Sequence, residues 1–258
     1  MATILFEEIV FGPIRSRRLG SSLGINLLPR HGKWCNFDCI YCECGWNKDG
    51  LKDKTLPTLD EVREALERRL NELKAEGTHI DTITFSGNGE PTAHPDFAAI
   101  IDHTVELRDR LYPEAVISVL SNASNLHKPA VCEALKKVNN PILKVDGCTE
   151  SFVNDINKPA PGYSLERTLN NLESFHGDFI LQTMFLKGEI DGRPLDSTEA
   201  SEVAGWQAIV RRLRPREIMM YTIDRETPMS GLRKVTIEEM EAIAAPLREE
   251  GFQIQIRG

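Results

Sequence analysis

The chain has 258 residues, of which 41% are apolar, and its formal net charge at pH 7 is −8. A chain of this length can bury one large core, and α/β barrels of similar length commonly form a single domain. The acidic balance argues against a long stretch of nucleic-acid backbone as a partner. No run approaches the roughly 20 apolar residues that cross a bilayer, and Glu7 and Glu8 lie where a signal peptide would be apolar. The sequence therefore predicts a soluble, cytoplasmic protein with no membrane partner.

Short β-branched segments alternate with longer amphipathic segments along most of the chain. Six segments have the composition of strands, and a short last strand is expected after them: 23–28, 80–85, 115–120, 142–145, 179–185, 217–223 and then 252–256. Helical spacing of apolar residues is found at 58–75, 95–111, 128–138, 163–175, 203–213 and 237–247. This alternation predicts an α/β fold with a parallel sheet and right-handed crossovers, a partial (β/α)6 TIM-like barrel. We expect a single domain over 1–258, with an N-terminal extension at 1–22 and the barrel at 23–258.

The reactive side of such a barrel is the edge at which its strands end. The loops expected at this edge are 31–46, 86–94, 121–125, 146–162, 187–194 and 224–231. They contain most of the unusual polar clusters of the chain. We therefore expect the functional site among them.

Three cysteines in the first of these loops give the strongest signal. The segment Cys35-Asn-Phe-Asp-Cys39-Ile-Tyr-Cys42 places three soft ligands within eight residues, which suits iron and sulfur. A [4Fe-4S] cluster held by three cysteines has one iron left to take another ligand. Two alternatives stay open: a structural zinc with a fourth ligand such as Cys44 or His31, and an electron-transfer cluster with a fourth protein ligand.

The same spacing, with Tyr41 before the last cysteine, resembles the signature loop of the radical S-adenosylmethionine (radical SAM) superfamily. The resemblance implies an enzyme in which Cys35, Cys39 and Cys42 hold a [4Fe-4S] cluster whose open iron binds S-adenosylmethionine. It also implies an external electron donor of the flavodoxin or ferredoxin type. Reductive cleavage of S-adenosylmethionine then gives a 5′-deoxyadenosyl radical that abstracts hydrogen from a substrate, while the protein supplies orientation and a dry cavity.

A glycine-rich segment follows the second expected strand, where this family places its motif for the methionine group. The residues with a cofactor role by this resemblance are Gly87, Asn88, Gly89, Glu90 and Pro91, and Tyr41 joins them. Glycine lets backbone approach a ligand closely, and a carboxylate such as that of Glu90 suits a cationic amine. Asn88 departs from the commoner Gly-Gly-Glu-Pro form.

The ends of the next two strands carry four further candidates for the same cofactor. Ser121 and Asn122 end the third strand, and Lys144 and Asp146 lie two residues apart at the fourth, so they share one face. The resemblance implies that such positions contact the ribose or the carboxylate of S-adenosylmethionine. The alternatives are helix capping or a turn for the first pair and an ion pair inside the barrel for the second.

Candidate substrate contacts lie in the later loops and strands. They are Cys148, Asn157, Lys158, Gln182, Asp224 and Arg225. The alternatives are ordinary loops and, for Gln182, packing inside the barrel. A basic stretch of Arg15, Arg17, Arg18, Arg30 and Lys33 can hold an anionic substrate or reductant, or can balance the acidic surplus of the chain itself.

The stretch 12–20, taken with the cysteine loop, resembles a branch related to wyosine-type tRNA radical enzymes and, more remotely, to glycyl-radical-enzyme activases. A tRNA-related substrate follows from the first resemblance, while the acidic charge argues against it; a small molecule, a peptide, a protein and a tRNA all stay open. The alternatives are an activase or modifier acting on a glycyl radical protein or peptide, and a non-enzymatic metal-binding or electron-transfer protein. The last alternative leaves the glycine-rich segment unexplained.

Overall fold

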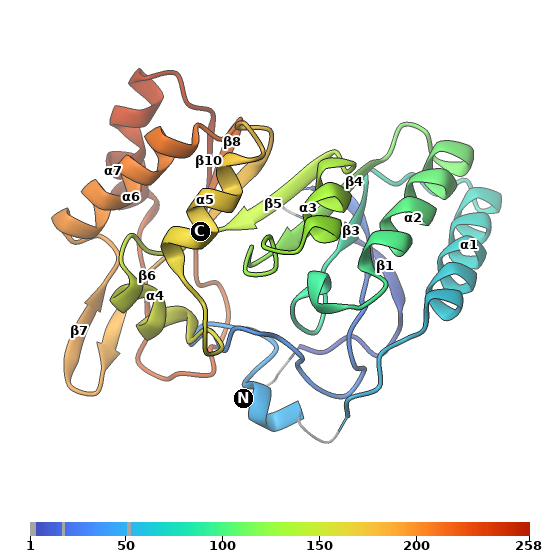
Figure 1. Cartoon of the computed structure of the whole chain (residues 1–258), viewed down its shortest axis with the longest axis horizontal. Helices are drawn as coiled ribbons and strands as arrows, with labels where there is room; N and C mark the ends of the chain where they lie inside the picture. The colour runs from blue at the N-terminus through green and yellow to red at the C-terminus, as the bar shows by residue number, and fades with distance from the viewer. Residues whose placement is uncertain (1–3, 17–18, 51–52) are drawn as a thin grey trace.

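The computed structural model describes residues 4–16, 19–50 and 53–258 (Figure 1). Its centre is a sheet in which neighbouring strands are β2 (Gly20–Ile25), β3 (Thr82–Phe85), β4 (Val116–Ser121), β5 (Asn140–Lys144), β6 (Ile180–Ile190), β8 (Glu217–Thr222) and β10 (Ile254–Arg257). Each of these strands runs parallel to the next. The six expected strands and the short last strand therefore all form. The predicted α/β class and partial barrel are confirmed.

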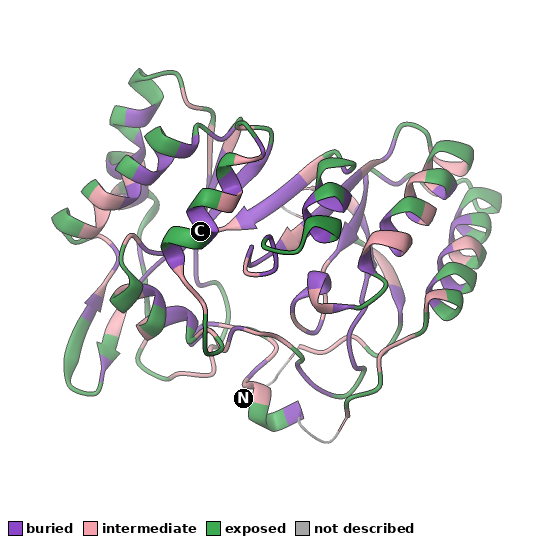
Figure 2. Cartoon of the chain, in the orientation of Figure 1, coloured by how far each residue is buried: buried purple, intermediate pink, exposed green. Residues whose placement is uncertain are grey.

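Helices occupy the connections and lie along the outer side of the curved sheet (Figure 1). They are α1 (Leu59–Ala75), α2 (Phe97–Leu111), α3 (Pro129–Lys136), α4 (Glu150–Asn157), α5 (Leu165–Glu173), α6 (Ala200–Leu213) and α7 (Ile237–Glu249). Thr58 and Glu61 form a reciprocal capping box that starts α1. Figure 2 shows the helices buried along one side and exposed along the other, as their amphipathic spacing predicts.

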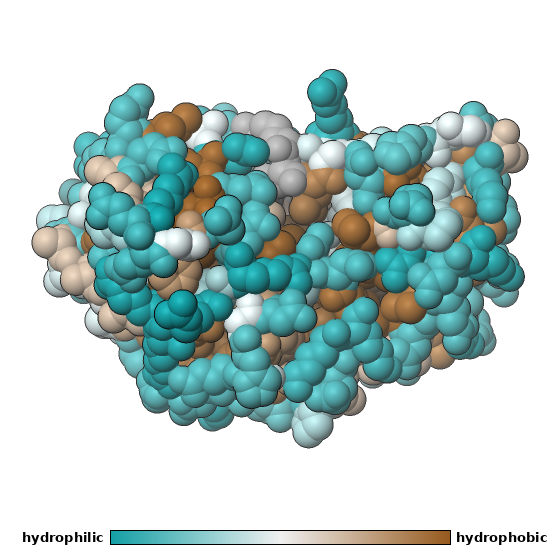
Figure 3. Space-filling view, turned by 90° about the horizontal axis from the view of Figure 1, so that it is seen from above, coloured by the Kyte–Doolittle hydropathy of each residue, from teal (hydrophilic) through white to brown (hydrophobic). Residues whose placement is uncertain are grey.

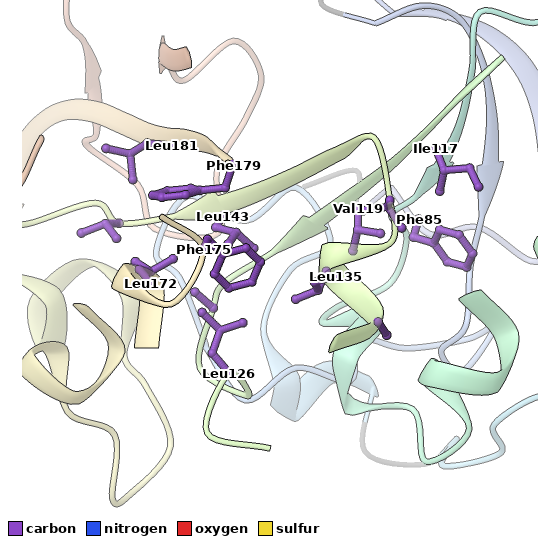
Figure 4. Close-up of a cluster of buried hydrophobic side chains, with 14 of the residues drawn as sticks. Phe85, Ile117, Val119, Leu126, Leu135, Leu143, Leu172, Phe175, Phe179 and Leu181 are labelled. Carbon is purple, nitrogen blue, oxygen red and sulfur yellow. The ribbon is translucent and has the colours of Figure 1, made fainter. Parts of the chain in front are cut away.

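The main core lies between the sheet and the helices that cover it (Figure 4). Phe85 of β3 and Phe179, which precedes β6, are fully buried there, and Leu135 of α3 and Leu172 of α5 pack into the same cluster. Phe175 meets Phe179 edge to face, with 6.0 Å between the ring centroids. Each such side chain contributes about 1.5–3 kcal/mol on burial. This core fixes the strand ends and thereby positions the loops of the active edge.

The N-terminal edge of the sheet differs from the expectation. Within the expected extension, β1 (Val10–Ser16) pairs antiparallel with β2. The register shifts between Phe11 and Ile14, where Gly12 and Pro13 interrupt the strand. Glycine and proline weaken a strand prediction because they are confined to edges and bulges. This hairpin forms one edge of the sheet and β10 the other, and the described residues show no pairing that would close the barrel between them.

The prediction of two loops at the active edge is wrong in part. Residues 187–194 form the end of β6 and a hairpin with β7 (Arg193–Asp196), while β9 (Arg233–Lys234) also pairs antiparallel with the end of β6. The expected loop 146–162 contains α4, which is only eight residues long. So short a helix gives little periodic signal and depends on tertiary packing. Two short 3-10 helices, η1 (Asn47–Gly50) and η2 (Pro91–Ala93), complete the described elements.

The outer surface is polar on the face seen from above. Figure 3 shows this face as mostly hydrophilic, with hydrophobic residues visible between polar ones. No helix in the described ranges is long and apolar enough to cross a membrane.

Candidate functional site

The cysteine loop is held between two other segments of the active edge by backbone hydrogen bonds. On one side it pairs with the glycine-rich segment: the Trp34 amide donates to the Asn88 carbonyl at 2.8 Å, and the Glu90 amide donates to the Trp34 carbonyl at 3.2 Å. On the other side the Asp38 amide donates to the carbonyl of Asn157, the last residue of α4, at 2.9 Å. The two predicted motifs are therefore neighbours in space.

Both motifs face one cavity of about 240 Å³ at the carboxyl ends of the strands. Its wall includes the predicted site residues Cys35, Cys39, Tyr41, Cys42, Gly87, Gly89, Glu90, Ser121, Asn122, Lys144 and Gln182. The structure thus brings together the cysteines, the glycines and most of the predicted cofactor contacts. Asn88, Pro91 and Asp146 do not line this cavity.

The donor set fits an iron–sulfur cluster. Three thiols from one loop face the same cavity, and thiolates are the ligands that such clusters prefer. Burial raises the pKa of the Cys35 and Cys39 thiols, so a positive partner is needed to hold them as thiolates. Lys33 supplies one: it is buried in the same wall, and its ammonium group donates to Asp38 at 3.0 Å. The described residues contain no group of three or more His, Cys, Asp or Glu side chains placed to hold a single metal ion.

Glu90 is the centre of a buried hydrogen-bond network that joins the glycine-rich segment to the end of β4. One carboxylate oxygen accepts from the Ser121 hydroxyl at 2.8 Å and from Thr92, and the other accepts from the Asn122 amide at 2.7 Å. Burial raises the pKa of Glu90 while these donors oppose the rise. In this structure the carboxylate predicted to meet a cationic amine is also the group that fixes the shape of the cavity wall.

Asn88 has a different position from the one expected of a cofactor contact. Its side chain is fully buried and points to the N-terminal segment, where it exchanges two hydrogen bonds with the backbone of Phe6 at 2.8 and 2.9 Å. It also donates to the Pro29 carbonyl at 2.8 Å. The departure from the commoner glycine thus attaches the glycine-rich segment to the chain that precedes β1. Pro91 begins η2 and stays off the cavity wall.

A second polar network lies beside the cavity around Tyr41. The Tyr41 hydroxyl contacts Asp146 and accepts from the Lys144 ammonium group at 3.0 Å. Lys144 also donates to the Tyr221 hydroxyl at 2.5 Å and lies 3.8 Å from Asp146, so the ion pair considered above is present. Although burial opposes it, Asp146 raises the pKa of Lys144, which keeps the group charged. The side-chain amide of Asn157 donates to the Tyr41 hydroxyl at 3.0 Å, to the Asp146 carboxylate at 2.8 Å and to the Cys39 sulfur at 3.4 Å.

Replacing Asn157 by alanine is expected to lower the free energy of unfolding by about 2 kcal/mol, because it removes the buried hydrogen bonds that its side chain donates to Tyr41 and Asp146. Asn154, exposed on the same helix, offers a matched control, for which Asn154→Ala is expected to change stability by less than about 0.5 kcal/mol. Urea denaturation of the protein without cofactors measures both. Equal effects of the two substitutions would contradict the role given to Asn157.

The predicted substrate contacts are not all at one place. Gln182 lines the cavity, whereas Asn157 does not line it and instead donates a hydrogen bond to Tyr41. Cys148 lies in a hollow between α5 and α6, where its sulfur donates to Glu202 at 3.2 Å, so its expected place at the active edge is wrong. Lys158 is exposed in the left-handed backbone conformation that ends α4. Asp224 and Arg225 line a second, neighbouring cleft.

The basic stretch predicted from the sequence does not form one patch. Arg17 and Arg18 lie outside the described residues. Of the others, Arg15 lines the second cleft, Arg30 lines a separate hollow, and Lys33 is buried beside the cysteines. Residues close together in the sequence are therefore distributed over three sites.

Six residues of the cavity wall were not among the predicted site residues: Lys33, Phe37, Cys44, Ser86, Leu120 and Tyr221. Lys33 was treated only as part of a basic stretch, although its position two residues before Cys35 was a usable signal. Tyr221, near the end of the strand expected at 217–223, lies on the wall beside Lys144. Cys44 also lines the cavity, with its sulfur 3.4 Å from the Gly87 carbonyl.

Comparison with known proteins identifies the class. Residues 30–197 match the radical SAM superfamily, and the chain belongs to it. A UPF0026 protein of Helicobacter pylori is 29% identical over 257 residues, covering 96% of this chain and 76% of that protein.

Two solved structures share the fold. Streptococcus suis SuiB bound to the precursor peptide SuiA superposes with a TM-score of 0.64 at 14% identity, covering 88% of this chain and 47% of the SuiB chain. An archaeal TYW1 gives a TM-score of 0.52 at 14% identity, covering 88% of this chain and 71% of its own. The chain thus spans about half the length of SuiB.

Proposed function

We propose that this protein is an enzyme that holds a [4Fe-4S] cluster on Cys35, Cys39 and Cys42 and binds S-adenosylmethionine in the adjoining cavity. When bound, these groups supply reductive cleavage of S-adenosylmethionine to a 5′-deoxyadenosyl radical that abstracts hydrogen from a substrate. The observation that carries the proposal is the single cavity shared by the three thiols and the glycine-rich segment. The non-enzymatic alternative explains the thiols and leaves the glycine-rich wall without a use.

The residues that line the cavity have different roles in binding the cofactor. Gly87 and Gly89 let the backbone approach the methionine group, while Glu90 fixes Ser121 and the Asn122 amide on the same side. Lys144 and Tyr41 also line the wall, and Asp146 and Asn157, which do not line it, contact them. These contacts orient the cofactor and exclude water from it.

Two partners follow from this chemistry. A reductant must deliver an electron to the cluster, and we propose a flavodoxin or ferredoxin type of donor. The substrate class stays open among a small molecule, a tRNA-related molecule, a peptide and a protein, and the tRNA-related reading follows from the sequence resemblance of 12–20 and the cysteine loop. A peptide or glycyl radical protein is the second candidate, supported by the fold shared with peptide-bound SuiB. The net charge of −8 weighs against a long nucleic acid.

The test is production of 5′-deoxyadenosine by anaerobically reconstituted protein with dithionite and S-adenosylmethionine. The variant with Cys35, Cys39 and Cys42 replaced by alanine is expected to make none. The matched control is Cys132→Ala, because Cys132 is buried in α3 and lies outside the cavity wall. If the cluster-loaded protein makes no product and S-adenosylmethionine does not perturb its electron paramagnetic resonance spectrum, the proposal is wrong.

A further inference from the structure

A second cleft of about 440 Å³ adjoins the cofactor cavity at the open side of the barrel. It lies where β1 and β10, the two edges of the sheet, show no pairing in the described part of the chain, and residues of both strands line it. Tyr41, Cys42 and Tyr221 belong to the walls of both spaces. The cleft therefore borders the cofactor cavity at these side chains.

The charges of the cleft are unevenly matched. Its acidic side chains are already paired, since Glu43 accepts from Arg225 at 2.6 Å and Asp224 lies 3.4 Å from Lys234. Arg15 of β1 and Arg257 of β10 also line it, from opposite edges of the sheet, and within the described ranges neither forms an ion pair. Two cations that face one cleft without an acidic partner attract an anion, and the guanidinium fork matches phosphate and carboxylate.

A row of side chains connects Arg257 to the cofactor cavity. Met184, Tyr221 and Arg257 stand in register on the neighbouring strands β6, β8 and β10, so they share one face of the sheet. All three line the cleft, and Tyr221 also reaches the cavity. Ile14, which is 50% exposed, adds an apolar wall beside Arg15. The cleft thus offers cationic groups at its outer end and apolar and aromatic groups toward the cofactor.

We propose that this cleft binds the substrate, and that the substrate is a small organic anion whose phosphate or carboxylate group lies between Arg15 and Arg257. The rest of the molecule then lies along Ile14, Met184 and Tyr221 and points to the cofactor cavity. The inference rests on the proposed function, because it takes the neighbouring cavity as the place of radical formation. A volume of about 440 Å³ suits a small ligand, and pockets of roughly 300–1,000 Å³ commonly hold one.

The test is calorimetric titration of the cluster-loaded protein, without oxygen, with inorganic phosphate and separately with succinate. These two arms distinguish phosphate from carboxylate recognition. The double variant R15Q/R257Q is expected to bind the preferred anion at least about tenfold more weakly, because two charge-assisted contacts are lost. The variant R15K/R257K keeps the charge and is expected to retain part of the affinity. R63Q/R68Q removes two charges from α1, away from the cleft, and is expected to bind as the unaltered protein does.

Three outcomes would overturn the inference: no binding of either anion, equal binding by R15Q/R257Q and R63Q/R68Q, or displacement of phosphate by mixed tRNA with a steep salt dependence. The last would assign the cleft to a nucleic acid. Anion binding does not require cleavage of S-adenosylmethionine, so 5′-deoxyadenosine formation by the unaltered protein reports on the proposed function separately. If the protein makes 5′-deoxyadenosine but binds no anion, the proposed function is supported and the anion site is wrong.

Discussion

Replacing Gly89 by alanine is expected to destabilise the protein by about 3 kcal/mol or more and to abolish binding of S-adenosylmethionine. The backbone of Gly89 has φ of +143°, and a Cβ added there would lie 1.8 Å from the Trp34 carbonyl oxygen. The neighbour is backbone of the cysteine loop, so it cannot move without breaking the pairing between the two motifs. One added methyl group therefore separates the glycine-rich segment from the cysteines.

Gly77→Ala is the matched control for this substitution. Gly77 also has a positive φ, +68°, but a Cβ there would meet nothing within 4 Å. It is expected to show only the backbone cost of that conformation, about 1–2 kcal/mol, and unchanged binding of S-adenosylmethionine. Urea denaturation and equilibrium dialysis of the reconstituted proteins measure both quantities. If Gly89→Ala bound the cofactor as well as Gly77→Ala did, the close approach of the two loops would be unimportant.

Replacing Glu90 by glutamine is expected to lower the free energy of unfolding by about 2 kcal/mol or more and to weaken S-adenosylmethionine binding by about tenfold. The carboxylate accepts from Thr92, Ser121 and the Asn122 amide. Glutamine fills the same volume but has one acceptor oxygen, and its NH2 group would face donors. The hydrogen bonds that join the glycine-rich segment to the end of β4 would then be lost.

Glu217→Gln is the control, because Glu217 begins β8 at the opposite end of the sheet and its buried Oε1 has no hydrogen-bond partner among the described residues. No hydrogen bond to Oε1 is lost there, so this variant is expected to match the unaltered protein within about 0.5 kcal/mol or to exceed its stability. Thermal denaturation and cofactor titration compare the two variants. A similar loss in both would show that burial of a carboxylate, rather than its hydrogen bonds, decides the effect.

Local spacing was enough to predict the two motifs that line the cavity with the three thiols. The cysteine motif and the glycine-rich segment each lie within a few residues of chain, and the alternation of strand and helix patterns placed both at one edge of the barrel. That edge is where the structure has them, on one cavity wall. The strand boundaries were also close, because buried β-branched segments bounded by helices leave few other registers.

The residues that sequence reasoning misplaced depend on contacts between distant parts of the chain. Cys148 lies between the end of β5 and the start of α4, yet its sulfur contacts Glu202 of α6 in a hollow between α5 and α6. Asn157 was expected in a loop. It is the last residue of α4, and its side-chain amide donates to the Tyr41 hydroxyl. No local sequence pattern predicts a helix of eight residues, such as α4. Nor does one predict a hydrogen bond between residues more than 50 positions apart, such as that from Cys148 to Glu202.

The bonds between Asn88 and Phe6 make the beginning of the chain part of the folding unit of the site. Because Asn88 both donates to and accepts from the Phe6 backbone, opening the glycine-rich segment also frees that backbone. Opening of the glycine-rich segment therefore also opens the segment that precedes β1. The amide proton of Phe6 is expected to exchange with solvent at least as fast as the glycine-rich segment opens, although this residue precedes the first strand of the barrel.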